Sequence, residues 1–84
     1  MTLQQMKYII AIVQYGSITE AAKRLFISQP SLSNAVKDIE TETGIEIFQR
    51  SVKGITLTSD GTEFLSYARQ VVEQYNLIES KYIL

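Results

Sequence analysis

The chain has 84 residues, of which 45% are hydrophobic and 20% charged, and its formal net charge is -1. This size and balance fit one small globular domain and exclude a disordered or fibrous chain. Cysteine and histidine are both absent. That removes disulfides, thiolate metal sites and the commonest general base, so we predict no cofactor, no metal site and no enzymatic activity.

The first predicted helix covers residues 3–15. Its apolar side chains recur at helical spacing, and Gly16 follows them as a stop signal. The residues of this predicted face are Leu3, Met6, Ile10 and Val13. The run KYIIAIV inside it is too short for a signal sequence or a membrane span, so we expect neither.

A second, short helix follows almost at once. Ser17 and Glu20 match the capping box, in which each side chain accepts a hydrogen bond from the other residue's backbone N–H. The helix is therefore predicted to begin at Ile18, and its inward face comprises Ile18, Ala21, Ala22 and Leu25. Two adjacent alanines on that face would let another helix cross at short range.

The third helix is predicted over residues 29–43. Ser28 is its N-cap, Pro30 lies in the first turn where its missing N–H costs nothing, and Gly44 ends it. Only two residues separate the second helix from this cap, so the two helices must pack against each other across a tight turn. This pattern is typical of a helix-turn-helix.

The third helix is predicted to be amphipathic. Its apolar arc contains Leu32, Ala35, Val36 and Ile39, whereas Pro30, Asn34, Lys37 and Thr41 lie opposite and Gln29 and Ser33 lie near the edges. Short polar residues, including Ser31, gather at the N-terminal end, and acidic residues fall in the C-terminal half. A recognition helix enters the major groove N-terminus first, so this polarity favours DNA binding over an ordinary solvated face.

A hairpin is predicted next, with strands near residues 47–50 and 55–58. The letters SVKG separate the strands, and Gly54 can adopt the positive φ that a hairpin turn needs. Arg50 then lies on the approach and Lys53 at the tip, as in a wing that reaches phosphates or a minor groove. A plain hairpin with solvated charges is the alternative, mainly for Arg50.

A long last helix is predicted from about residue 59 to residue 82. Thr58 is its N-cap, and Gly61 in the first turn is a mild cost. Its apolar residues at heptad spacing are Phe64, Ala68, Val71, Tyr75, Ile78 and Tyr82. Such a helix is roughly 36 Å long, more than three short helices can cover, so we predict that its distal half pairs with another chain.

The segment GSITEAAKRLFISQPSLSNAVKDIETETGIEIFQRSVKGITLTSDG resembles the N-terminal winged helix-turn-helix of LysR-type bacterial transcriptional regulators. The most specific parts are AA at 21–22, SQPSLS at 28–33, IE at 39–40, FQR at 48–50, and LT at 57–58 followed by Gly61. The resemblance covers nearly the whole chain. It implies a mainly helical fold with a small hairpin wing, a DNA-binding domain over residues 1–58 and a linker and dimerisation helix over residues 59–84.

The resemblance also implies how these parts work. The third helix would read the major groove, the wing would touch the backbone and minor groove, and the long helix would join two subunits. A homodimer on a pseudo-palindromic promoter site in the bacterial cytoplasm follows, with a small-molecule effector bound by a C-terminal domain that has no counterpart here. The predicted DNA-binding residues are Gln29, Pro30, Ser31, Ser33, Asn34, Lys37, Arg50 and Lys53.

Two features depart from the expected pattern. Position 34 is often arginine in that family and is Asn34 here, which loses a phosphate or guanine contact and could pair bidentately with adenine. The slightly negative net charge is also unusual for a DNA-binding domain, although charge can be distributed unevenly. The alternative function is a helical interaction module that dimerises through its last helix without binding DNA.

Overall fold

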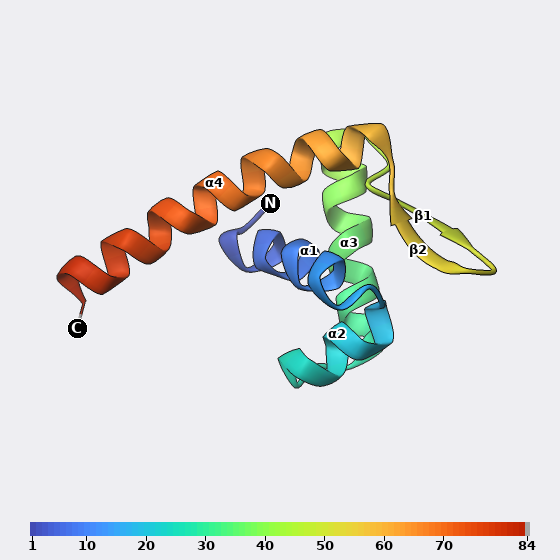
Figure 1. Ribbon diagram of the computed structural model, residues 1–84, viewed down its shortest axis with the longest axis horizontal. Helices are drawn as coiled ribbons and strands as arrows, with labels where there is room; N and C mark the ends of the chain where they lie inside the picture. The colour runs from blue at the N-terminus through green and yellow to red at the C-terminus, as the bar shows by residue number, and fades with distance from the viewer. Residues whose placement is uncertain (84) are drawn as a thin grey trace.

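The computed structural model describes residues 1–83; Leu84, the last residue of the predicted 59–84 segment, lies outside the described part. The helices are α1 (Leu3–Tyr15), α2 (Ile18–Leu25), α3 (Gln29–Thr43) and α4 (Ser59–Tyr82), and the strands are β1 (Phe48–Ser51) and β2 (Gly54–Leu57). In Figure 1, α3 stands between α2 below and α4 above, with the hairpin projecting on one side. The predicted mainly helical fold with a hairpin wing is confirmed.

The helix bounds agree with the predictions, whereas each strand differs by one residue. The two strands pair antiparallel, from Phe48 opposite Leu57 to Ser51 opposite Gly54. Ile47 was predicted to begin the first strand, yet it is fully buried and its carbonyl oxygen accepts a hydrogen bond from the backbone N–H of Thr58 at 3.0 Å. Residue 47 therefore belongs to the junction between the hairpin and α4 rather than to the hairpin.

The predicted capping box at the start of α2 forms only in half. The Ser17 hydroxyl accepts from the backbone N–H of Glu20 at 3.1 Å, but the Glu20 carboxylate accepts from Arg24 Nε at 3.1 Å instead of from Ser17. A charged partner one turn along the helix competes successfully for that carboxylate. The complete capping box lies at the start of α1, between Thr2 and Gln5, and was not predicted.

The tight turn between α2 and α3 is made without glycine. Phe26 adopts the left-handed conformation, with φ 57° and ψ 40°. Its N–H donates to the Lys23 carbonyl at 3.2 Å, and the N–H of Ile27 donates to the Ala22 carbonyl at 3.1 Å. These two bonds form the Schellman motif, which reverses the chain directly after the helix.

The core lies where α1 packs against α2, α3 and α4. The predicted inward residues of α2 and α3 are buried, except Leu25, which is half-buried. On α1 the prediction was partly wrong. Its deepest residues are Ile9 and Ile12, whereas the predicted Leu3, Met6, Ile10 and Val13 are only half-buried. Because α1 is covered on two sides, its nearly continuous apolar run does not reveal which side is deeper.

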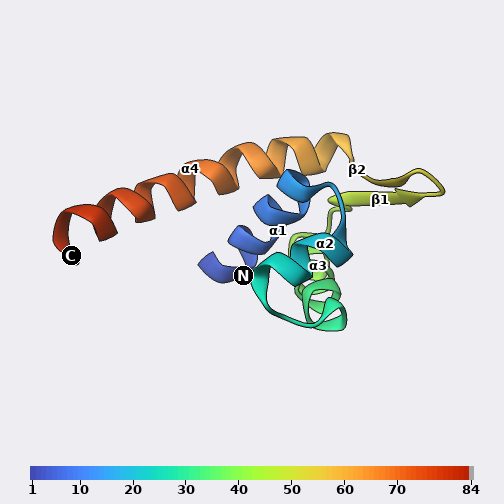
Figure 2. The same cartoon turned by 60° about the horizontal axis from the view of Figure 1, so that its bottom comes forward.

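The long helix α4 has a covered half and an uncovered half. Leu65 and Ala68 are buried against the rest of the chain, whereas the apolar side chains from Val71 onward are mostly exposed. Figures 1 and 2 show the C-terminal half of α4 extending beyond the other elements. None of the helices described over residues 1–83 is both long enough and apolar enough to span a membrane.

Candidate nucleic-acid interface

The outer face of α3 presents polar side chains to solvent. Pro30, Asn34, Lys37 and Thr41 are exposed, and the residues on the opposite side of the helix are buried in the core. Ser28 caps the helix by accepting from the backbone N–H of Ser31 at 3.1 Å. The positive end of the helix dipole therefore coincides with the exposed N-terminal turn.

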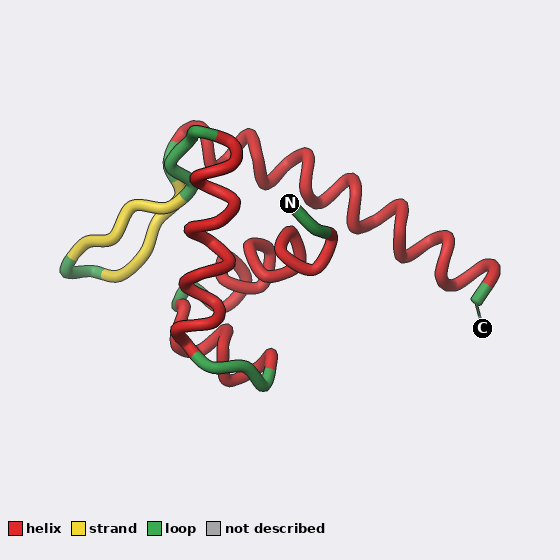
Figure 3. Tube along the Cα trace, turned by 180° about the vertical axis from the view of Figure 1, so that it is seen from behind, coloured by secondary structure: helices red, strands yellow, loops and turns green. Residues whose placement is uncertain are grey.

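Two clefts separate this face from the hairpin. Ser33, Asn34 and Lys37 line the larger cleft, together with Arg50 of β1. Gln29 lines the smaller cleft, where Arg50 contributes again. The fold thus brings five of the eight predicted DNA-binding residues to the region between α3 and the wing, and Figure 3 shows the hairpin projecting beside α3.

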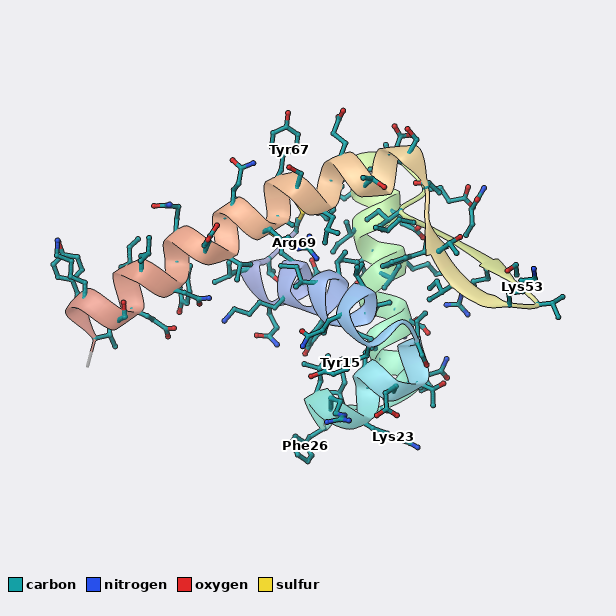
Figure 4. All side chains as sticks on the ribbon, in the orientation of Figure 1. Tyr15, Lys23, Phe26, Lys53, Tyr67 and Arg69 are labelled. Atoms are coloured by element: carbon teal, nitrogen blue, oxygen red, sulfur yellow. The ribbon has the colours of Figure 1, made fainter. Side chains whose placement is uncertain are left out.

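The other three predicted residues lie outside both clefts. Pro30 is exposed at the start of α3, and Lys53 sits at the hairpin tip, far from the helical body (Figure 4). The Ser31 hydroxyl accepts a hydrogen bond from the Ser28 hydroxyl at 2.8 Å, so it takes part in the cap. Gly54 has φ 119°, which confirms the positive φ predicted for this turn.

The basic residues near α3 take part in none of the ion pairs found in the described part of the chain. Over residues 1–83, the two ion pairs are Met1 with Glu42 and Arg24 with Glu20. Lys37, Arg50 and Lys53 take part in neither pair and are exposed. Their side chains can therefore meet phosphate groups without first breaking an intramolecular ion pair.

An acidic residue of α3 holds the hairpin in place. Glu40 Oε2 accepts hydrogen bonds from the backbone N–H of Ile47 at 2.7 Å and of Phe48 at 3.4 Å. This role was not predicted, although Glu40 belongs to the IE pair that carries part of the family resemblance. Because its carboxylate bonds to backbone donors, part of the acidity of α3 serves to orient the wing.

The hairpin is joined to α4 by a compact junction. The Thr58 hydroxyl accepts from the backbone N–H of Gly61 at 2.8 Å, as predicted for an N-cap, and donates to the carbonyl oxygen of Glu46. Gly61 is buried, and a Cβ at this position would lie 2.1 Å from the Ile47 carbonyl oxygen. Glycine is therefore required for this close approach, rather than being the mild cost predicted.

The residues of the predicted heptad stripe of α4 fall into a buried group and an exposed group. Ala68 is 3% exposed and Phe64 is half-buried, so within the single chain both pack against the core. The more distal members Val71, Tyr75, Ile78 and Tyr82 are exposed. The exposed Tyr67 points away from the helical body (Figure 4), and it lies beside this stripe.

A polar recognition helix, a basic hairpin beside it and a partly uncovered long helix together define a winged helix-turn-helix domain of the DNA-binding class. A family model described as "Bacterial regulatory helix-turn-helix protein, lysR family" matches residues 3–62. The chain therefore belongs to the lysR family and contains its helix-turn-helix DNA-binding domain.

Curated relatives agree with this assignment. The HTH-type transcriptional regulator TcbR of Pseudomonas sp. (strain P51) is 40% identical over 73 residues, which cover 87% of this chain and 25% of TcbR. ClcR of Pseudomonas putida is 39% identical over 72 residues, which cover 86% of this chain and 24% of ClcR. The chain thus spans about a quarter of the length of these relatives.

Solved structures of DNA complexes share the same fold. The CbnR DNA-binding domain in complex with DNA superposes with a TM-score of 0.89 at 36% identity, over 96% of this chain and 93% of that one. The BenM DNA-binding domain with catB site 1 DNA also gives 0.89, at 32% identity, over 95% of this chain and 86% of that one.

Proposed function

We propose that this domain reads a specific duplex DNA site with α3 in the major groove and the hairpin on the backbone or in the minor groove. The observation that carries the proposal is the common placement of the polar face of α3 and Arg50 along the same clefts. Figure 4 adds Lys53 at the end of the projecting hairpin. This arrangement matches a reading helix flanked by a phosphate-binding arm.

The eight residues divide by chemistry. Lys37, Arg50 and Lys53 contact phosphates, because they are exposed cations outside the ion pairs. Gln29 and Asn34 read base edges through their amides, and Ser33 lies between them. Pro30 and Ser31 complete the contact surface at the N-terminal turn of α3.

The chain also contains a helix that can join two DNA-binding domains in a homodimer. Residues 1–58 act as the reading head, and residues 59–84 act as a linker and dimerisation helix whose covered half is part of the same core. The exposed distal stripe supports a homodimer that places two heads on a pseudo-palindromic promoter site in the bacterial cytoplasm. A small-molecule effector acts through a C-terminal domain, and the matched segment, which covers only 25% of TcbR, leaves room for such a domain. Those relatives are transcriptional regulators, which supports a role without catalysis.

Replacing Lys53 by alanine should flatten the salt dependence of DNA binding. The substitution removes one phosphate contact, so the slope of log K against log salt concentration should decrease in magnitude by about 1. Fluorescence anisotropy titrations of a labelled duplex at several salt concentrations measure this slope directly.

Lys81→Ala is the matched control, because Lys81 is exposed in the last turn of α4. Figure 1 shows that this end of α4 lies far from the hairpin. Its slope should equal that of the wild type. An unchanged slope and affinity for Lys53→Ala would show that the hairpin tip does not contact DNA phosphates. Absence of wild-type binding to any duplex at low salt would instead favour the interaction module without DNA binding.

Replacing Asn34 by alanine should change which base is preferred at one position of the site rather than the overall affinity for DNA. If Asn34 makes a bidentate contact with one base, its loss should remove about 1–3 kcal/mol of discrimination at one position of the site. Competition binding with single-base variants of the site measures this preference. Equal weakening on every sequence would identify Asn34 as a backbone contact.

A further inference from the structure

Two predicted DNA-binding residues on α3 are bonded to each other in the free protein. The side-chain Nε2 of Gln29 donates a hydrogen bond to the Ser33 hydroxyl oxygen at 3.5 Å. The two residues are four apart on one helix, so their side chains face each other. Gln29 is exposed, whereas Ser33 is half-buried and lines the cleft beside the hairpin.

This bond decides which groups of the Gln29 amide remain available. A glutamine amide has two N–H donors and one carbonyl acceptor. With one N–H directed to Ser33, the amide keeps its Oε1 acceptor and a single N–H donor. Adenine presents one donor and one acceptor in the major groove, whereas guanine presents two acceptors at N7 and O6. The remaining groups of Gln29 therefore match adenine in full and guanine only in part.

We propose that Ser33 is a positioning residue that makes Gln29 selective for adenine over guanine. The inference rests on the proposed function, because it requires Gln29 to face a base edge. Ser33 acts through Gln29, and its own hydroxyl need not touch DNA. Because Ser33 holds the long Gln29 side chain in place before DNA binds, less rotamer entropy is lost on recognition.

Neighbouring hydroxyls do not share this task. The Ser31 hydroxyl bonds with that of Ser28 in the cap, 2.8 Å away. Thr41→Ala is the matched control, since Thr41 is an exposed hydroxyl residue of α3 outside the predicted DNA-binding set and lies far along the helix from Gln29. Ser33→Thr is the conservative variant, because it keeps a hydroxyl on the same atom position.

The experiment uses the full 84-residue chain and a duplex selected from random sequences by the wild type. Each position of that duplex is changed to the other three base pairs, and Kd is measured for every variant protein. Gln29→Ala first identifies the position at which adenine is preferred. Ser33→Ala should then reduce the preference for adenine over guanine at that position by about tenfold.

Four further results are expected. Ser33→Thr should keep the preference, and Thr41→Ala should leave it intact. The double variant Gln29→Ala with Ser33→Ala should behave as Gln29→Ala alone, because Ser33 has no other reader to position. In the DNA-free protein, Ser33→Ala should shift the NMR resonances of the Gln29 side-chain amide. Thermal melting of each variant confirms that the fold is retained.

The outcomes separate this inference from the function on which it rests. A wild-type chain without sequence preference would overturn the proposed function. A selective wild type in which Gln29→Ala changes no base preference would overturn the inference alone. The same holds if Ser33→Ala weakens every site equally, adds to the effect of Gln29→Ala, or leaves the Gln29 amide resonances unmoved.

Discussion

Replacing Gly61 by alanine should strongly destabilise this domain, although alanine is the better helix former by about 1 kcal/mol. The added Cβ would lie 2.1 Å from the carbonyl oxygen of Ile47 and 2.9 Å from its carbonyl carbon. Both are backbone atoms of a fully buried residue, so no flexible side chain can move aside. We expect a loss of about 3 kcal/mol or more in the free energy of unfolding. For a domain of this size that corresponds to a fall of more than about 10 °C in Tm.

Thermal and urea unfolding followed by circular dichroism measure this change. Ser66→Ala is the control, because Ser66 is exposed on the same helix and its replacement should raise Tm slightly through helix propensity. The sign of the effect is diagnostic: helix propensity alone would raise Tm for Gly61→Ala. A Tm equal to or above that of the wild type would show that the hairpin and α4 are not in the close contact described.

Replacing Val71 by glutamate should convert the proposed homodimer into monomers. Val71 is 46% exposed in the single chain, so the monomer tolerates a charge there. In the proposed seam the same charge would be buried without a partner, which is strongly unfavourable. Loss of the second reading head should weaken binding to a two-half site by about 10²- to 10⁴-fold, while binding to a half-site should change little. Sedimentation equilibrium and titrations on both duplexes measure these effects.

Gln70→Glu provides the matched control, since it adds the same charge at an exposed position about 100° around α4 from Val71 and outside the proposed seam. It should leave both the dimer and DNA affinity intact. If the wild-type chain remained monomeric throughout the micromolar range, that result would contradict the proposed homodimer, even if the chain still bound DNA.

The elements of this protein follow from local signals in the sequence. Caps and stop residues such as Ser28, Gly44 and Thr58 lie at the observed ends of their helices. These signals work because a helix end needs partners for its own backbone groups, and residues within a few positions supply them. The outward face of α3 was predictable for a similar reason, since its apolar and polar residues follow the helical period closely.

The tertiary structure alone decided how these elements meet. Nothing near Gly61 in the sequence indicates that the Ile47 carbonyl approaches it, and nothing near Glu40 indicates that its carboxylate receives the first residues of the hairpin. The stripe on α4 likewise reads as one seam in the sequence, yet in the folded chain, where α1 packs against α4, Ala68 is buried and Val71 is exposed. These contacts join residues separated by seven or more positions through packing of whole elements. Periodicity and capping signals describe one helix or strand at a time. Which element packs against each face is therefore known only from the assembled fold.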